Sequence, residues 1–181
     1  MNAIFKGLVF VAATLALQLP ATTLAKDAAT ASPAQVLCAY FSPPDNAASA
    51  IIEQIARSRS EVLVQAYGFT HNGIAQALVQ AHHRGVKVQV IMDAKSAKTN
   101  RYVTEILDRE RMTYRWDGKH AIAHNKVMII DQDVIITGSF NFTNSAQSRN
   151  AENLLILRSP ALAIEYRENW MDHWGHSRNQ P

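Results

Sequence analysis

Four polar residues in the second half of the chain have the types and spacing that chemistry on a phosphate group needs. His124 and Lys126 are two residues apart, and Ser139 and Asn141 repeat this spacing further along. Side chains two residues apart on a strand project from the same face of a sheet. If the two segments form a hairpin, we expect all four side chains to meet at its open end.

This combination of side chains favours attack on a phosphate. A histidine can act as the nucleophile, while a lysine and an asparagine stabilise negative charge on the phosphate oxygens. The cluster contains neither the carboxylates that hold magnesium or calcium nor a second nearby histidine with zinc-ligand geometry. We therefore predict catalysis with no metal and no other cofactor.

The complete pattern resembles a known family. The run His124-x-Lys126-x4-Asp131-x6-Gly138-Ser139-x-Asn141 matches the signature of the phospholipase D superfamily. A bare H-x-K pair carries no information, whereas the whole pattern is very improbable by chance. The chain length, the single motif copy and the N-terminus look most like bacterial Nuc-type endonucleases, and the resemblance extends over about residues 36–174.

The resemblance implies a role for each matching residue. His124 forms a covalent phosphohistidine, and Lys126 and Asn141 bind the phosphate of the substrate. Ser139 supports the site. Glu152 stands where the family has an acidic residue that hydrogen-bonds the catalytic histidine; the alternative is an exposed carboxylate at a strand edge.

Two further residues of the pattern, Asp131 and Gly138, are assigned to the support of the site. Asp131 has an odd offset from His124, so on a regular strand its side chain points to the other face. We therefore interpret Asp131 as a structural residue and not as a general base.

The single copy of the motif has a consequence for assembly. The family's reaction needs two histidines, one as nucleophile and one that protonates the leaving group. We therefore expect a symmetric homodimer whose two-fold axis passes through a shared active site. A monomer would need His71 or His120 as the second histidine.

The other histidines and several basic residues have weaker claims to function. We expect His120 to line the entrance of the site or to be exposed, and His173 and His176 to be solvated. His82 and His83 suit the end of a helix. Four basic residues allow two interpretations, a rim that binds a sugar-phosphate backbone or an ordinary solvated surface. They are Lys95, Lys98, Arg101 and Lys119.

The elements that must position these residues alternate between strand and helix patterns. We expect strands at Val36–Phe41, Glu61–Tyr67, Val86–Met92, Thr113–Trp116, His124–Asp131, Val134–Thr137 and Asn153–Leu157. Helices are expected from Asp45 or Asn46 to Ser58, from Asn72 to Gly85, and over Asn100–Arg111 and Ala161–Trp174. This order predicts an α/β/α sandwich with a mixed, mostly parallel central sheet.

Composition fits a single domain over residues 35–181. The chain has 181 residues, 48% of them hydrophobic, and a net charge of +3, which is compatible with a polyanionic partner. Cys38 is the only cysteine, so no intrachain disulfide can form. We expect it to be a small buried hydrophobe, with an interchain disulfide as the alternative.

The N-terminus has the order of a secretory signal peptide. Lys6, an apolar run and a short small-residue stretch lead to a predicted cleavage site after Ala25. Residues 26–34 are expected to form a flexible leader. These features predict a periplasmic or secreted protein without stable membrane insertion after cleavage.

Three functions remain open at this point. The leading one is a non-specific endonuclease that cleaves DNA, with RNA as a further substrate. A phospholipase D acting on phospholipid headgroups would use identical chemistry. A catalytically inactive nucleic-acid binding module is the third, and the intact His124, Lys126 and Asn141 argue against it.

Overall fold

The computed structural model describes residues 33–181. In this part of the chain the strands are β1 (Gln35–Ser42), β2 (Glu61–Ala66), β3 (Lys87–Asp93), β4 (Thr113–Asp117), β5 (Lys126–Ile130), β6 (Val134–Gly138) and β7 (Glu152–Arg158). The helices are α1 (Ala47–Arg57), α2 (Asn72–His83), α3 (Ala97–Arg109), α4 (Asn144–Ser148) and α5 (Pro160–His176), with a 3-10 turn η1 (Ala94–Ser96). The predicted signal peptide and most of the predicted leader lie outside the described residues.

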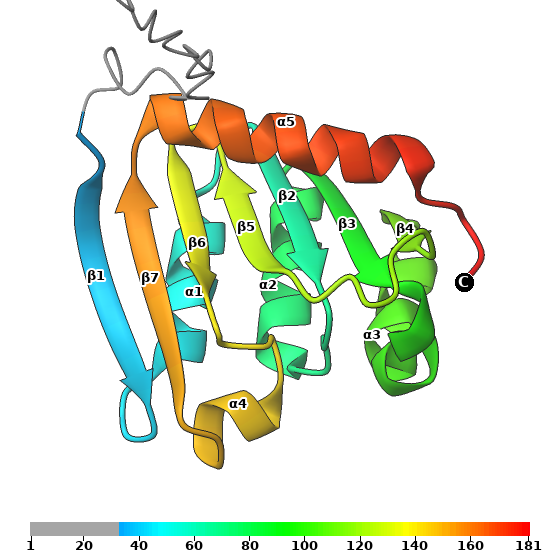
Figure 1. The fold of residues 1–181 in the computed structure, drawn as a ribbon, viewed down its shortest axis with the longest axis horizontal. Helices are drawn as coiled ribbons and strands as arrows, with labels where there is room; N and C mark the ends of the chain where they lie inside the picture. Colours follow the sequence, from blue (N-terminus) through cyan, green and yellow to red (C-terminus); the bar gives the residue numbers. More distant parts are fainter. Residues whose placement is uncertain (1–32) are drawn as a thin grey trace, which may run out of the picture. The chain divides into compact units, whose positions relative to one another are not determined.

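The strands form one seven-stranded sheet in the order β1-β7-β6-β5-β2-β3-β4. Helices α1, α2 and α3 cover one face, and α5 crosses the other (Figure 1). The predicted α/β/α sandwich with a mixed sheet is therefore confirmed. No helix within residues 33–181 is both long and apolar enough to cross a membrane.

The expectation that the sheet is mostly parallel is wrong. Only β2–β3 and β3–β4 are parallel, and the other four pairs are antiparallel. Parallel neighbours need a long crossover, which helices α2 and α3 provide. A hairpin loop joins β5 to β6, and residues 118–125 lead from the end of β4 to the start of β5 along one sheet edge, so these connections reverse the chain.

Two hydrophobic clusters hold the layers together. The larger one lies between the sheet and α1–α3, and the smaller one lies under α5. Trp170 of α5 is fully buried there, and its indole Nε1 donates a hydrogen bond of 2.9 Å to the Val64 carbonyl. Trp174 stacks on it at 4.9 Å and packs against the same cluster, so the aromatic side chains of this helix contribute to the core.

Most predicted elements are present, with shifted ends. Asn46 caps α1 as one of the two expected residues, whereas His71 and not Asn72 caps α2 through its Nδ1. Helix α3 begins at Ala97, before the predicted start, and α4 was not expected. The strand predicted from His124 begins at Lys126, so His124 lies in the preceding loop.

Cys38 corrects a further expectation, because its side chain is exposed and not buried. It lies on β1, which is an edge strand with a register shift between Val36 and Cys38. Val36, Ala39 and Phe41 of the same strand are exposed as well, so little of the chain packs over this part of β1.

Asp131 fastens the β5–β6 turn to the loop before β2. Its carboxylate accepts hydrogen bonds of 2.8–3.2 Å from the backbone N–H groups of Arg59, Ser60 and Glu61, and one from the Ser60 hydroxyl. Burial alone would raise the pKa of Asp131, but these hydrogen bonds outweigh it and hold the pKa below its ordinary value. The residue lies at the end of β5 opposite Lys126, where it ties two loops together.

We predict that Asp131→Asn lowers stability while sparing catalysis. Asn tolerates the left-handed backbone at this position, φ 53°, so the variant removes mainly the charge. Loss of charge-assisted hydrogen bonds should lower the free energy of unfolding by about 1–3 kcal/mol at neutral pH. Because the folded pKa is depressed, this difference should shrink as the pH falls below about 4. Urea denaturation at several pH values measures it.

The matched control is Asp133→Asn in the same turn, since Asp133 pairs with Arg158 on the surface. Exposed ion pairs contribute about 0–1 kcal/mol, so the control should stay close to the unchanged protein. Equal effects of both substitutions, or a folded Asp131→Asn variant without catalytic activity, would contradict the structural role.

Candidate active site

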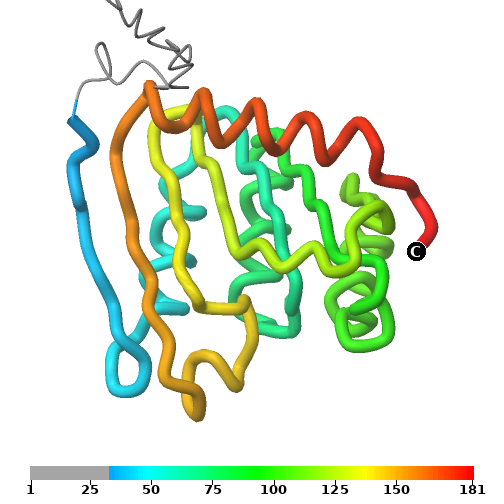
Figure 2. Tube along the Cα trace, in the orientation of Figure 1, coloured from blue at the N-terminus to red at the C-terminus, as the bar shows by residue number. Residues whose placement is uncertain are grey.

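The predicted site residues gather at one edge of the sheet. This edge is formed by the C-terminal ends of β2, β3 and β6 and the N-terminal ends of β5 and β7, as the strand directions require. Figure 2 traces residues 118–125 from β4 across this edge to β5. His124 lies in that segment, Lys126 opens β5, and Ser139 follows β6.

His124 and Lys126 meet around the ring of Tyr67. The His124 imidazole is exposed, and its ring centroid lies 4.6 Å from that of Tyr67. Lys126 is buried, with Nζ 5.2 Å from the Tyr67 ring centroid and 2.7 Å from the His124 carbonyl oxygen, to which it donates. Tyr67 was not singled out from the sequence; its place at the end of a buried strand was the available signal.

The Lys126 ammonium is held in a poorly solvated position. Burial lowers its pKa, and the negative charge of Glu152 opposes that shift. A cation with few water contacts interacts more strongly with a phosphate than one in bulk water. Lys126 is thus suited to binding the substrate phosphate beside His124.

Ser139 and Glu152 form a linked pair at the end of β6. The Ser139 hydroxyl donates a hydrogen bond of 2.6 Å to Glu152 Oε2 and accepts one of 3.0 Å from the Asn153 N–H. Asn150 Nδ2 donates to Glu152 Oε1 at 3.1 Å. The predicted hydrogen bond between Glu152 and the His124 imidazole is not among those of residues 33–181, so Glu152 here orients Ser139 and faces Lys126.

Gly138 and Asn141 lie at the same edge of the sheet. Gly138 has φ 148°, and a Cβ there would lie 2.2 Å from the Asn153 carbonyl oxygen, so only glycine allows β6 and β7 to approach this closely. The Asn141 Oδ1 accepts a hydrogen bond of 3.4 Å from the Gly68 N–H. With its oxygen turned toward Gly68, the amide can present its nitrogen to a phosphate oxygen.

The residues before and after His124 in the sequence are each held by a hydrogen bond of their backbone. The Ala123 N–H donates 2.9 Å to Asp93 Oδ1, and the Tyr67 N–H donates 2.9 Å to the Asn125 carbonyl. Asp93 is itself buried, and its Oδ2 accepts a hydrogen bond of 2.9 Å from the Ser96 hydroxyl. Asp93 therefore fixes the loop that carries the imidazole. Asp93 directly follows the predicted strand Val86–Met92, and no role was assigned to it from the sequence.

The other histidines make contacts outside the cluster around Lys126. His71 caps α2, and burial lowers its pKa. His83 contacts Glu110 at 3.0 Å near the end of α2. The expectation that His173 and His176 are solvated is wrong, because both turn inward toward Asp117, together with His120. The spacings Asp117-x2-His120 and His173-x2-His176 were the signal in the sequence.

Fold and site together define a phosphodiesterase-type centre, and comparison with known proteins assigns the family. A family model described as "Cardiolipin synthase, PLD-like domain" matches residues 51–174. The chain belongs to the phospholipase D superfamily, a class of hydrolases that act on phosphodiester bonds.

Individual relatives agree with this family. The chain is 41% identical to a Rickettsia felis protein named "Phospholipase D" over 132 residues, 73% of this chain but only 66% of that relative. It is 28% identical to the mouse "Mitochondrial cardiolipin hydrolase" over 130 residues, 72% of this chain and 59% of that relative. The crystal structure of Nuc, a phospholipase D family member from Salmonella typhimurium, superposes with a TM-score of 0.76 at 31% identity, covering 81% of this chain and 97% of that one.

We predict that Asp93→Ala lowers phosphodiesterase turnover because the loop carrying His124 loses an anchor. Small displacements of a reacting group can cost about 10–100-fold in rate. The effect should appear in kcat with little change in KM, since Lys126 and Asn141 are untouched. Steady-state kinetics on a cleavable bis-aryl phosphodiester measures both constants.

Asp93→Asn is the matched control, because the amide keeps an oxygen that can accept from the Ala123 N–H. It should retain most of the activity. A folded Asp93→Ala variant with an unchanged kcat would show that the anchor does not position His124.

Proposed function

We propose that the protein is a metal-independent endonuclease that cleaves DNA through a covalent phosphohistidine at His124. The observation that carries the proposal is the pairing of an exposed imidazole with a buried ammonium, that of Lys126, around the Tyr67 ring. The imidazole is accessible to a large substrate, and the cation beside it needs an anionic partner.

The reaction proceeds in two displacements. The neutral imidazole of His124 attacks phosphorus, a nitrogen–phosphorus bond forms, and the bond to the leaving oxygen breaks. Lys126 and Asn141 stabilise the charge on the non-bridging oxygens. A second imidazole, supplied by His124 of the partner subunit, donates its proton to the leaving oxygen. It then takes a proton from the water that hydrolyses the phosphohistidine and restores His124.

A basic surface beside the site favours nucleic acid as the substrate. Lys95, Lys98 and Lys119 are exposed on the segments that follow β3 and β4, at the sheet edge where His124 lies. Exposed cations at this edge can neutralise phosphates of a nucleic acid without reading bases. The names of several relatives keep phospholipid headgroups as the second candidate substrate.

We further propose that the protein acts in the periplasm or outside the cell, after removal of residues 1–25. The order of basic, apolar and small residues in the sequence supports export. The intact mass of the protein recovered from the periplasm would reveal the cleavage site.

We predict that the purified protein cleaves plasmid DNA in the presence of EDTA and leaves phosphatidylcholine vesicles intact. No carboxylate takes part in the proposed steps, and Lys126 supplies the positive charge. Gel analysis of DNA and choline release from vesicles, each run with the His124→Ala variant as control, measure the two activities.

Three results would contradict this proposal. Loss of DNA cleavage in EDTA with recovery on adding magnesium would reject the metal-independent mechanism. Choline release without DNA cleavage would assign the site to phospholipids. DNA binding without cleavage of any phosphodiester would identify an inactive binding module.

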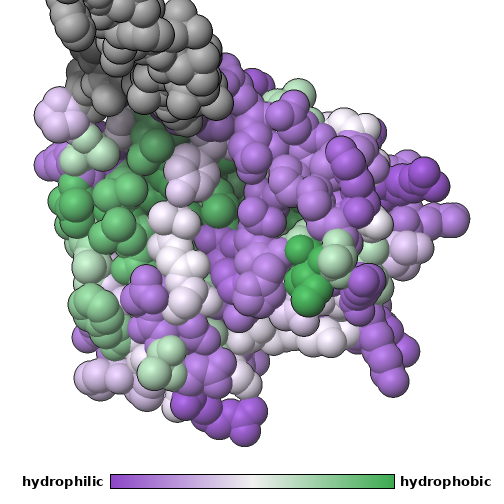
Figure 3. Space-filling model, viewed as in Figure 1, coloured by the Kyte–Doolittle hydropathy of each residue, from purple (hydrophilic) through white to green (hydrophobic). Residues whose placement is uncertain are grey.

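An apolar surface next to the site supports the shared active site. Figure 3 shows apolar side chains gathered over β1 and β7, beside the polar surface of α5. Val36 and Phe41 on β1 are 58% and 63% exposed. Phe41 is in register with Asn153, whose N–H binds Ser139, so this surface adjoins the catalytic edge. Burying it against a second copy of the chain would place the two sites close together.

We predict that His124→Ala chains inactivate wild-type chains by forming mixed dimers with them after exchange by refolding. With random pairing at an equal ratio, about a quarter of the dimers are wild-type on both sides, and activity per wild-type chain falls to about half. Excess mutant should drive it toward zero. DNA cleavage normalised to wild-type chain concentration measures the effect, and a tag pull-down confirms exchange.

Constant activity per wild-type chain after confirmed exchange would refute the shared site. It would direct attention to His71 and His120 as the second histidine.

A further inference from the structure

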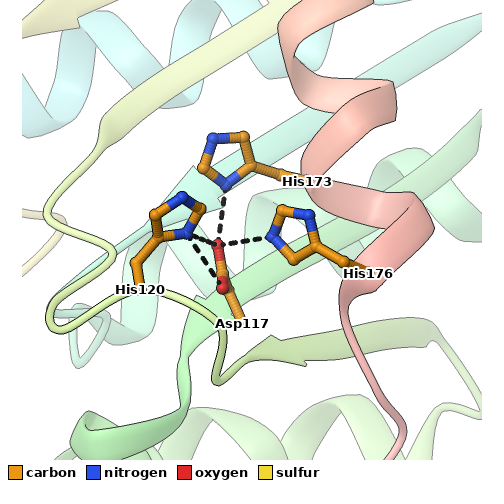
Figure 4. Close-up of side chains that lie close together, drawn as sticks. All are labelled: Asp117, His120, His173 and His176. Atoms are coloured by element: carbon orange, nitrogen blue, oxygen red, sulfur yellow. Dashed lines mark hydrogen bonds and ion pairs between the residues drawn. The ribbon is translucent and has the colours of Figure 1, made fainter.

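Four side chains outside the catalytic cluster converge on one point. Figure 4 shows the imidazoles of His120, His173 and His176 directed at the carboxylate of Asp117. His120 Nδ1, His173 Nδ1 and His176 Nε2 lie 2.9, 2.7 and 3.2 Å from the same oxygen, Asp117 Oδ2. The four nearest ligand atoms all lie within 4.8 Å of one another.

Hydrogen bonding within the cluster leaves one group unsatisfied. His176 Nε2 is buried and has no hydrogen-bond partner among residues 33–181, although it lies near Asp117 Oδ2. Burial alone would raise the pKa of Asp117, but its contacts with His173, His120 and His176 hold the pKa well below its ordinary value. Buried polar atoms without a partner are rare in folded proteins, and a bound ion would satisfy this nitrogen.

The convergent side chains stand on elements that are already fixed. Asp117 ends β4, and His173 and His176 are one turn apart on α5. The backbone groups of Trp116 and Arg178 exchange two hydrogen bonds of 2.7 and 2.9 Å, which join β4 to the segment after α5. The Lys119 N–H donates to Asp117 Oδ1 at 3.0 Å, so Oδ2 faces the imidazoles.

We propose that Asp117, His120, His173 and His176 bind one divalent transition-metal ion, with Zn²⁺ the best match. Three imidazole nitrogens and one carboxylate oxygen are ligands that Zn²⁺ accepts at about 2.0–2.2 Å in tetrahedral geometry. Imidazole-rich sites disfavour Mg²⁺ and Ca²⁺, which prefer oxygen ligands. The His120 side chain is 42% exposed, which gives the ion a path from solvent.

The proposed ion has a structural role. Four protein ligands fill a tetrahedral shell, so no position remains for an activated water. The ion joins β4, α5 and the segment between Asp117 and His124, in which His120 precedes the catalytic histidine by four residues. Metal at this cluster therefore stabilises the loop that carries His124 without entering the phosphodiester chemistry.

The test measures metal directly and needs no enzymatic activity. Apoprotein prepared by dialysis against a chelator is incubated with Zn²⁺, desalted and analysed for metal by mass spectrometry. Co²⁺ added to the apoprotein reports four-coordinate ligation through its visible absorption. We expect about one ion per chain, Co²⁺ absorption that Zn²⁺ displaces, and loss of both in His120→Ala and His173→Gln.

Thermal denaturation gives an independent readout. Zn²⁺ at a hundredfold excess over its Kd should raise the Tm by about 5–10 °C in the wild-type protein and not in the two variants. His83→Ala is the matched control, because His83 contacts Glu110 away from the cluster and should leave metal binding unchanged.

Two outcomes overturn the proposal. The first is a wild-type chain that retains no metal after desalting and shows no Co²⁺ absorption. The second is His120→Ala and His173→Gln variants that bind as much Zn²⁺ as the wild type. Because His120 is an exposed loop residue, we expect the His120→Ala variant to fold normally. An unchanged circular dichroism spectrum would verify this. Neither outcome tests the proposed phosphodiester chemistry, because none of its steps uses this ion.

Discussion

The burial of the Lys126 ammonium is the constraint on which the site depends. A buried cation is costly unless nearby groups compensate it. Here the compensation comes from the His124 carbonyl, the face of the Tyr67 ring and the charge of Glu152. None of these is a full ion pair at contact distance, so a phosphate that reaches this edge adds the missing negative partner. The same arrangement brings the phosphate beside the exposed His124 imidazole.

The rest of the fold keeps this arrangement rigid. Asp131 locks the far end of β5 to the start of β2, so the central strand that begins with Lys126 cannot shift its register. Gly138 permits the close approach of β6 and β7 that places Ser139 beside Glu152. Asp93 holds the loop before β5. Each anchor acts on backbone groups, which explains why a small chain can fix polar side chains at an open edge.

Sequence reasoning reached the sandwich, nearly all the strands and the residues of the motif, because strand alternation and a fixed motif depend only on local spacing. It could not foresee contacts made across the fold. Tyr67 and Asp93 join the site from strands far from the motif in sequence. The convergence of His173 with Asp117 depends on how α5 lies on the sheet. The antiparallel pairing of β5 likewise follows from the path of residues 118–125, which hydrophobic patterning does not reveal.

The covalent adduct on His124 is the most direct test of the central claim. The wild-type protein, mixed with a DNA oligonucleotide and quenched in alkali within milliseconds to seconds, can be digested and analysed by tandem mass spectrometry. Alkali preserves nitrogen–phosphorus bonds that acid would break. We predict a nucleotidyl phosphoramidate on the peptide containing His124 that is absent from the His124→Ala variant. An adduct on another residue, or turnover of the oligonucleotide with no adduct at any quench time, would contradict nucleophilic catalysis by His124.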